Sequence, residues 1–177
     1  MSVDLKSLVR TIPDYPKKGI LFRDITTLIE DPKGFRESIR RIADAHRDGA
    51  FTHVAGIEAR GFIFGAGVAI ELGAGFVPIR KRGKLPGETI GQNYVLEYGV
   101  DTIEIHANVL NANHRVLLVD DLIATGGTAI AAISLLRRTG AVADDAAFVI
   151  DLPDLGGADK LRAENVNIQA LIEFAGH

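Results

Sequence analysis

The sequence contains no cysteine, which excludes disulfide bonds, thiolate nucleophiles and cysteine-based zinc sites. It also lacks a long apolar run. The longest, residues 62–70, is far shorter than the roughly 20 residues that span a bilayer. The first 19 residues carry Asp4 and alternate polar with apolar side chains, unlike a signal peptide. These absences predict a cytoplasmic protein with no membrane partner.

An excess of positive charge is also missing. The chain has 20 Lys and Arg against 23 Asp and Glu, so its formal net charge is −3. Such a balance gives no general attraction for nucleic acid, and we expect no nucleic-acid partner. Any site for an anion must therefore be local. A length of 177 residues with 47% hydrophobic side chains is ordinary for a single globular domain spanning residues 1–177.

Several common catalytic motifs are absent as well. Gly83 and Lys84 are followed by Leu85, so there is no nucleotide-binding P-loop, and the glycine pairs beginning at Gly65 and Gly73 lack the third glycine of a dinucleotide fingerprint. The five histidines have no zinc-type spacing, and no G-x-S-x-G motif occurs. Common ATPase, dehydrogenase, zinc-protease and serine-hydrolase motifs are thus excluded.

Short apolar runs alternate with amphipathic stretches along most of the chain. Nearly all-apolar strands separated by helices indicate a parallel sheet covered on both faces, which is an α/β fold. Asp31 followed by Pro32 is typical of a helix start. We expect strands at residues 52–57, 75–79, 115–119 and 146–152, and helices at residues 2–11, 32–46, 60–72 and 127–138.

Residues 81–110 interrupt this alternation. They contain the turn-forming sequence LPGETIGQ, followed by alternating polar and apolar residues at 94–96 and 102–105. This pattern predicts a hairpin that projects from the sheet. A segment of this length outside the core is usually functional.

The sequence VLLVDDLIATGGT, residues 116–128, places two carboxylates beside a loop of small residues and hydroxyls. Glycines and the start of a helix supply amides for a phosphate, although a plain helix cap with a tight turn would also fit ATGGT alone. Carboxylates repel phosphate, so they must bind something else, such as sugar hydroxyls or a hydrated Mg²⁺. A phosphorylated sugar satisfies both halves of the sequence.

This stretch resembles the 5-phosphoribosyl-1-pyrophosphate motif of the type I phosphoribosyltransferases. GILFRDIT from Gly19, EARGFIFG from Glu58, IRKRGKLPGET from Ile79 and LEYG from Leu96 occur in the order and approximate spacing of the adenine phosphoribosyltransferase family. The resemblance implies a parallel, Rossmann-like phosphoribosyltransferase sheet flanked by helices. It also implies a small N-terminal hood at about residues 1–30 and a flexible β-hairpin lid at about residues 81–110.

The resemblance further implies an activity. The family transfers the 5-phosphoribosyl group from 5-phosphoribosyl-1-pyrophosphate to N9 of adenine, giving AMP and pyrophosphate in purine salvage. Mg²⁺ is the implied cofactor, held mainly by the substrate's pyrophosphate and by waters, with no direct protein ligand. A homodimer is also implied, in which Arg80 or Lys81 contributes across the interface.

By the same resemblance, each motif receives a role. Glu97 protonates adenine N7 as N9 attacks, Tyr98 in the lid excludes water, and the catalytic residues also include Arg60 and the two aspartates, Asp120 and Asp121. The implied binding residues are Ala124, Thr125, Gly126, Gly127 and Thr128 for the 5′-phosphate, Glu58, Ala59, Arg60, Arg80, Lys81 and Lys84 for pyrophosphate, and Leu21, Phe22, Arg23 and Leu152 for adenine. The Glu58–Gly61 stretch resembles the family's pyrophosphate loop, which often contains a non-proline cis peptide bond.

Other interpretations remain open for single motifs. Taken alone, RKRGK fits a solvated basic loop, Phe22 a core residue and Glu97 a carboxylate at the end of a strand. A phosphoribosyltransferase for hypoxanthine or guanine is the alternative within the superfamily. A nucleic-acid-binding regulator that senses phosphoribosyl pyrophosphate is a further alternative, but it would need a basic face or an appended DNA-binding unit, and the sequence offers neither.

Overall fold

The computed structural model describes residues 3–96 and 99–176. Nine strands and five α-helices, together with three short 3₁₀ turns, are assigned in these two ranges. They are η1 (Lys6–Leu8), β1 (Arg10–Pro13), β2 (Leu21–Asp24), α1 (Thr26–Glu30), α2 (Pro32–His46), η2 (Arg47–Gly49), β3 (His53–Ile57), α3 (Arg60–Leu72), β4 (Gly75–Lys81), β5 (Thr89–Leu96), β6 (Gly99–His106), β7 (Arg115–Ile123), α4 (Gly127–Arg137), β8 (Val142–Asp151), η3 (Pro153–Leu155), α5 (Gly157–Ala163) and β9 (Asn167–Glu173).

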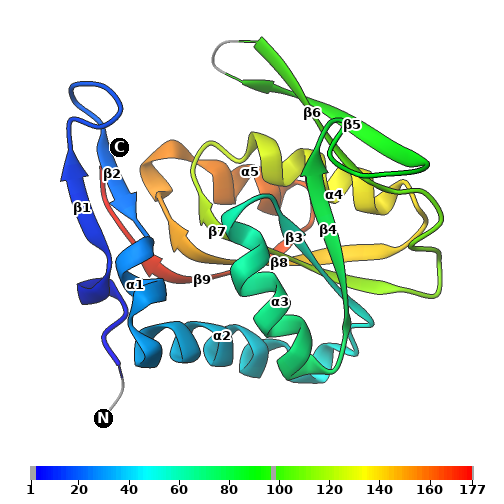
Figure 1. Cartoon of the computed structure of the whole chain (residues 1–177), viewed down its shortest axis with the longest axis horizontal. Coiled ribbons are helices and arrows are strands. Elements are labelled where there is room, and N and C mark those ends of the chain that lie inside the picture. Colours follow the sequence, from blue (N-terminus) through cyan, green and yellow to red (C-terminus); the bar gives the residue numbers. More distant parts are fainter. Residues whose placement is uncertain (1–2, 97–98, 177) are drawn as a thin grey trace.

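The central sheet has the strand order β5-β6-β4-β3-β7-β8-β9 (Figure 1). The five strands from β4 to β9 in this order are parallel to their neighbours, whereas β6 is antiparallel to both β4 and β5. From β3 the chain continues to β4 on one side, and then returns to β7 on the other side. This change of direction is a topological switch point, where open α/β sheets bind ligands at the carboxyl ends of the strands.

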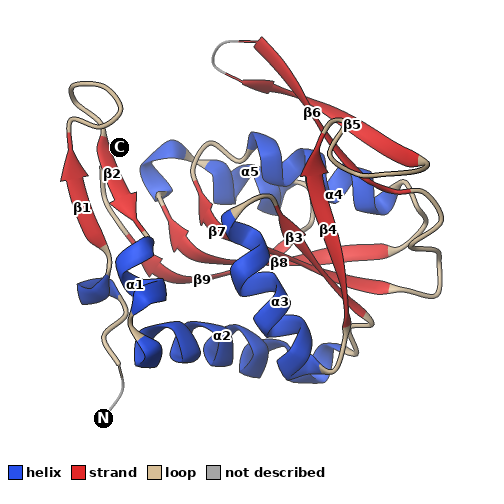
Figure 2. Ribbon diagram, in the orientation of Figure 1, coloured by secondary structure: helices blue, strands red, loops and turns tan. Residues whose placement is uncertain are grey.

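Helices cover both faces of the parallel strands (Figure 2). On one face, Phe64 and Val68 of α3 belong to the same buried cluster as Leu117 of β7. On the other face, Leu135 of α4 clusters with Phe148 of β8. In β3, β7 and β8, successive apolar residues are therefore buried, which is why these strands lack the alternation of a half-exposed sheet.

Most of the predicted helices agree closely with the structure. α2 and α3 have the predicted bounds, and α4 ends one residue earlier than expected. The Asp31 carboxylate accepts hydrogen bonds from the amides of Lys33 (3.0 Å) and Gly34 (2.6 Å), so it caps α2 as its position before Pro32 indicated.

The predicted helix at residues 2–11 is wrong. Only the short turn η1 forms there, and the chain then enters β1, which pairs antiparallel with β2. Leu5 and Val9 have the four-residue spacing of a helix face, but both are buried in the core from non-helical positions. An isolated helix of this length is marginal, and strand pairing satisfies the same backbone groups.

Three strands are longer than predicted, and β3 begins one residue later than predicted. β7 continues four residues beyond Val119, because its pairing with β8 extends to Ile123 opposite Asp151. Asp120 and Asp121 therefore lie within the strand. β8 begins four residues earlier than predicted, and β4 continues to Lys81. The pair β1–β2, helix α5 and strand β9 were not predicted.

The predicted hairpin is confirmed. β5 and β6 pair from Thr89 opposite His106 to Leu96 opposite Gly99, and β6 joins the sheet through Arg80 of β4 opposite Glu104. The hairpin lies beside α4 (Figure 1), and the Arg138 guanidinium at the end of that helix donates to the Gly91 carbonyl oxygen of β5 at 2.6 Å. Its movement as a lid stays a prediction.

The N-terminal segment lies beside the C-terminal strand (Figure 1). The Arg23 guanidinium of β2 donates a hydrogen bond to the Ala175 carbonyl oxygen (2.9 Å) and lies 4.5 Å from the centre of the Phe174 ring. Strand β2 is thus in direct contact with the residues that follow β9. No helix in the described ranges is long and apolar enough to cross a membrane.

Candidate active site

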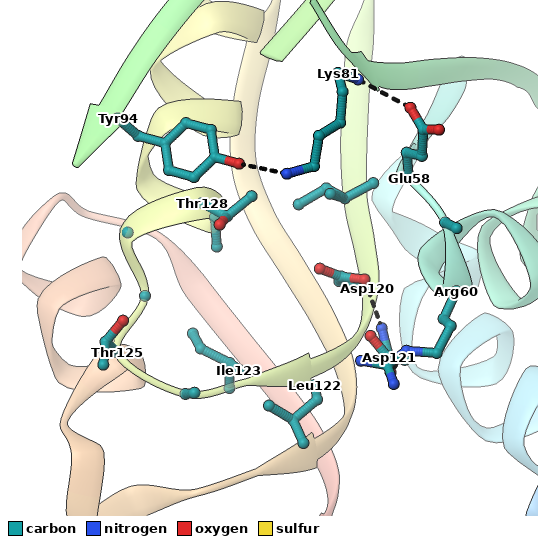
Figure 3. A pocket seen from close by; sticks show the side chains of 16 residues that line it. Glu58, Arg60, Lys81, Tyr94, Asp120, Asp121, Leu122, Ile123, Thr125 and Thr128 are labelled. Atoms are coloured by element: carbon teal, nitrogen blue, oxygen red, sulfur yellow. Dashed lines mark hydrogen bonds and ion pairs between the residues drawn. The ribbon is translucent and has the colours of Figure 1, made fainter. Parts of the chain in front are cut away.

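A pocket of about 310 Å³ opens at the carboxyl ends of β3 and β7, at the switch point of the sheet (Figure 3). Its walls come from the start of α3, the end of β4, the hairpin and the β7–α4 connection. The lining residues are Ile57, Glu58, Ala59, Arg60, Lys81, Tyr94, Asp120, Asp121, Leu122, Ile123, Ala124, Thr125, Gly126, Gly127, Thr128 and Ala129. The predicted phosphate, carboxylate and pyrophosphate motifs thus meet in one cavity.

Two adjacent carboxyl groups stand in this pocket. Asp121 is buried, and its Oδ2 lies 2.7 Å from Nε of Arg60 at the start of α3. The Asp121 amide donates to Oδ1 of Asp120 at 2.9 Å. The guanidinium of Arg60, which we expected to bind pyrophosphate, is therefore also the counter-ion of Asp121.

Burial changes how this pair binds protons. Loss of water contact raises the pKa of Asp120 well above its ordinary value, and the negative charge of Asp121 raises it further. Burial also raises the pKa of Asp121, while Arg60 opposes that rise. The pair consequently takes up a proton more readily than two exposed aspartates.

Gly61 allows Asp120 to approach α3 closely. A Cβ atom at Gly61 would lie 2.6 Å from Oδ1 of Asp120 and 3.1 Å from the Val119 carbonyl oxygen. Any side chain there would displace the carboxyl group or the strand. The glycine of the EARG sequence is required by this contact.

The 124–128 loop connects β7 to α4. Gly126 has φ +84°, a left-handed conformation that favours glycine. No side chain caps the first turn of α4 within the described ranges, so its amide groups are available to a ligand. With the hydroxyls of Thr125 and Thr128, these amides form the kind of anion cradle that the sequence predicted.

Glu58 connects the end of β3 to the basic residues of β4. Its carboxylate lies 3.2 Å from Nη2 of Arg80 and accepts a hydrogen bond from the Lys81 amide at 2.9 Å. The hydrogen bond from Arg80 is the main reason why the pKa of Glu58 is lowered. The Glu58–Ala59 peptide bond is cis, as the resemblance implied.

Lys81 extends from β4 into the pocket. Its ammonium group forms an ion pair with Asp101 of β6, and the Tyr94 hydroxyl of β5 donates to Oδ2 of Asp101 at 3.1 Å. This ion pair raises the pKa of Lys81 and lowers the pKa of Asp101. Tyr94 and Asp101 had no predicted role, because the hairpin register that aligns them was not determined by any motif.

The predicted adenine residues do not line this pocket. Leu21, Phe22 and Arg23 lie in β2, where the Phe22 ring stands edge-on to Tyr15 at 5.2 Å. Leu152 is buried beyond the end of β8, and its amide donates to the Ile123 carbonyl oxygen at 3.0 Å.

Two of the predicted pyrophosphate residues also lie elsewhere. Arg80 and Lys84 do not line the pocket either, and Nη1 of Arg80 donates to the Lys84 carbonyl oxygen at 3.0 Å. Glu97 and Tyr98 fall outside the described residues.

The residues present fit a hydrated metal better than a fully protein-bound one. Among the described residues, no group of three or more His, Asp or Glu side chains is arranged to hold a metal ion. Asp120 and Asp121 do face the pocket, and carboxylate oxygens suit the water shell of Mg²⁺.

Comparison with known proteins identifies the family. The profile of the phosphoribosyl transferase domain matches residues 25–160. The adenine phosphoribosyltransferase of Parvibaculum lavamentivorans is 55% identical over 99% of this chain and 100% of its own length. That of Bradyrhizobium sp. BTAi1 is 58% identical over 99% of this chain and 98% of its own length. The chain belongs to the adenine phosphoribosyltransferase family.

Solved adenine phosphoribosyltransferases have the same fold. The enzyme from Thermoanaerobacter pseudethanolicus is 47% identical, with a TM-score of 0.91 over 97% of this chain and 98% of its own. The Giardia lamblia enzyme, solved in complex with 9-deazaadenine, is 37% identical, with a TM-score of 0.92 over 98% of each chain. The α/β phosphoribosyltransferase fold is therefore confirmed.

Proposed function

We propose that this pocket transfers the 5-phosphoribosyl group from 5-phosphoribosyl-1-pyrophosphate to N9 of adenine, giving AMP and pyrophosphate. The N9–C1 bond of the nucleotide forms as the bond from C1 to the pyrophosphate oxygen breaks. One observation carries the proposal: a pair of carboxyl groups, of which Asp121 is buried, and a loop rich in amides line the same cavity. A phosphorylated sugar has hydroxyls for the first and a phosphate for the second.

In this assignment the 124–128 loop binds the 5′-phosphate through its amides and the hydroxyls of Thr125 and Thr128. Asp120 and Asp121 bind the ribose hydroxyls. Negative charge on the pair also stabilises the positive charge that develops on the ribose ring in the transition state. The ion pair with Arg60 supports this role, because it favours the charged form of Asp121.

Pyrophosphate is assigned to the opposite wall. The backbone at Glu58 and Ala59, together with the cations of Arg60, Arg80, Lys81 and Lys84, would bind it. The contacts of Glu58 with Arg80 and with the Lys81 amide support this assignment, since they hold the end of β4 against the β3–α3 turn. Mg²⁺ would enter with the pyrophosphate and neutralise its charge, and Asp120 and Asp121 would contact the waters around it.

Adenine is assigned to Phe22 and Leu152, which would stack on its faces, and to the backbone of Leu21 and Arg23, which would bind its polar edge. Glu97 is the proposed acid–base residue at adenine N7: its carboxylate would accept the N7 proton as N9 attacks, and in the reverse direction it would return that proton as the acid. Tyr98 would exclude water. Support for the β2 residues comes from the Arg23 side chain, which is held against Phe174 and Ala175 and so fixes that strand.

We also propose a homodimer. Ile63 and Ile70 lie seven residues apart on α3, hence on one side of the helix, and their exposed fractions are 39% and 81%. A second copy of the chain would cover them. Sedimentation equilibrium should give a dimer for the wild type and a weaker dimer for Ile70→Glu.

A contribution of Arg80 or Lys81 across the interface stays a prediction, since Lys81 lines the pocket of its own chain. Mixed dimers of Lys81→Ala and Asp120→Asn subunits test it for Lys81. Activity returns only if Lys81 serves the partner's site, because one site then has both wild-type residues. The Arg80→Ala variant tests Arg80 in the same way.

The decisive assay supplies phosphoribosyl pyrophosphate and Mg²⁺ with one base at a time: adenine, hypoxanthine, guanine, uracil or orotate. Pyrophosphate release should be fastest with adenine. Preference for a 6-oxo purine would replace adenine by the hypoxanthine or guanine alternative. No release with any base would reject transfer itself.

A cytoplasmic location stays a prediction.

A further inference from the structure

The 124–128 loop is supported from behind by the segment from Gly156 to Lys160. This segment contains the start of α5, which lies on the side of the loop away from Asp120 and Arg60 (Figure 3). None of its residues lines the pocket. No motif in the sequence assigned it a role.

Gly157 packs directly on the backbone of the loop. Its amide donates to the Ala124 carbonyl oxygen at 3.0 Å. A Cβ atom at Gly157 would lie 2.3 Å from that oxygen and 2.7 Å from the Gly126 nitrogen. The contact is reciprocal, since a Cβ atom at Gly126 would lie 2.9 Å from the Cα of Gly157. Two backbones therefore touch where neither can carry a side chain.

Lys160 fixes the next peptide unit. Its ammonium group donates to the Thr125 carbonyl oxygen at 3.0 Å. The neighbouring carboxylate of Asp159 accepts a hydrogen bond from Arg162 at 2.7 Å, so it has its own cationic partner. The positive charge of Lys160 is thus directed at the loop.

These two bonds determine where the loop's amides point. In a planar trans peptide, the carbonyl and the amide of one unit point in opposite directions. With the carbonyls of Ala124 and Thr125 turned toward Gly157 and Lys160, the amides of Thr125 and Gly126 are directed away from α5. Within the described ranges, neither amide has a hydrogen-bond acceptor of its own.

We propose that Gly157 and Lys160 are positioning residues for the 5′-phosphate: they hold two carbonyls of the 124–128 loop so that two successive amides face the phosphate. Neither residue touches the substrate. The inference rests on the proposed role of the loop. It adds that the cradle is set by backbone contacts from α5, and not only by the glycines of the loop.

The main test compares Lys160→Met, which keeps length but loses the donor, with Lys160→Arg, which keeps a donor. We expect the KM for phosphoribosyl pyrophosphate to rise about three- to tenfold in Lys160→Met, the range for one lost hydrogen bond, and to recover partly in Lys160→Arg. The KM for adenine should change less than twofold. Lys33→Met removes the same charge from an exposed position on α2 that does not line the pocket, so it is the matched control and should resemble the wild type.

Gly157→Ala tests the close backbone contact. We expect the KM for phosphoribosyl pyrophosphate to rise more than in Lys160→Met, because the loop backbone must shift. Gly156→Asn is its control: Gly156 has φ +71°, which asparagine tolerates, and its Cβ would meet nothing within 4 Å. Thermal unfolding checks that Gly157→Ala folds. If Gly157→Ala does not fold, the comparison of Lys160→Met with Lys160→Arg is the test, because Lys160 is exposed.

Binding of AMP and adenosine separates this inference from the proposed function. The wild type should bind AMP far more tightly than adenosine, and Lys160→Met should reduce that ratio by the same factor as the rise in KM. Equal binding of the two ligands by the wild type would reject the phosphate role of the loop. Strong discrimination that Lys160→Met leaves intact would reject the positioning role alone.

Discussion

The two walls of the pocket are built in different ways. The β7–α4 wall consists of backbone held by close contacts at Gly126 and Gly157, in the middle of the parallel sheet. The opposite wall consists of long side chains held by ion pairs, such as Lys81 with Asp101. Backbone contacts are insensitive to salt, whereas exposed ion pairs are screened. The difference predicts a fixed site for the proposed 5′-phosphate and an adjustable one for the proposed pyrophosphate.

The largest effect is expected for Glu97, the proposed acid–base residue. Glu97→Ala should lower kcat by roughly 10²- to 10⁴-fold, the range for general acid–base catalysis, with little change in the binding of phosphoribosyl pyrophosphate. Steady-state kinetics with both substrates measure this split. Glu88→Ala, an exposed glutamate just before β5, serves as control. Unchanged turnover would remove the role from Glu97.

On the β7 wall, Asp120→Asn should lower kcat/KM roughly 100-fold, because stabilisation of the positive ribose is lost. It should also stabilise the fold. The pKa of Asp120 is raised, so the folded chain binds this proton more tightly than the unfolded chain, and stability falls as pH rises from the ordinary aspartate range through the raised pKa. Asparagine removes that loss.

Thermal melts at several pH values test this stability effect. The melting temperature of Asp120→Asn should exceed that of the wild type at pH 7, and the difference should vanish in acid below the ordinary aspartate range. Asp48→Asn, which changes an exposed aspartate, should show neither effect. A lower melting temperature at pH 7 would mean that Asp120 stabilises the fold.

Gly126→Ala tests the rigidity of the loop wall. The backbone of Gly126 is left-handed, and a Cβ atom there would lie 2.9 Å from Gly157. Because both features disfavour alanine, kcat/KM for phosphoribosyl pyrophosphate should fall about 10- to 100-fold. Gly73→Asn, at an open left-handed position after α3, is the control for backbone conformation. Wild-type kinetics in Gly126→Ala would show that the loop adjusts freely.

The smallest effect is expected from Asp101→Asn on the side-chain wall. Loss of this exposed ion pair frees Lys81, and the KM for phosphoribosyl pyrophosphate should change only about two- to fivefold. The change should shrink as salt is added, because the wild-type pair is itself screened. Kinetics at two ionic strengths check this, with Glu88→Gln as control. An effect larger than that of Gly126→Ala would reverse the comparison of the two walls.

The sequence predicted the backbone wall better than the side-chain wall, for a physical reason. Apolar runs and the Asp31 cap are local signals, so α2, α3 and the parallel strands followed from them. The role of Asp101 depends on the register in which β5 pairs with β6. The role of Lys160 depends on the packing of α5 against the 124–128 loop. The prediction of a helix at residues 2–11 was wrong for the same reason: residues 10–13 pair with β2, which is a contact that no local signal indicates.

Motifs predicted those pocket residues that lie within them, and these include Arg60 and Lys81, which are far from Asp120 in the sequence. Asp120, Asp121 and the 124–128 loop are contiguous, and they meet in the pocket as expected. The adjacent glycines Gly156 and Gly157 can be seen in the sequence. No pattern in the sequence, however, relates them to the 124–128 loop that Gly157 contacts. That contact depends on the crossover through β8.

The contact of β2 with the residues that follow β9 has a consequence for engineering a new base preference. Arg23 links β2 to Phe174 and Ala175, and all three lie outside the segment, residues 25–160, that this chain shares with phosphoribosyltransferases in general. A graft of only the first residues from another phosphoribosyltransferase would leave Arg23's partners behind. Replacing the residues before 25 and those after 160 together would preserve the contacts of Arg23 with Phe174 and Ala175, while residues 25–160 stay unchanged.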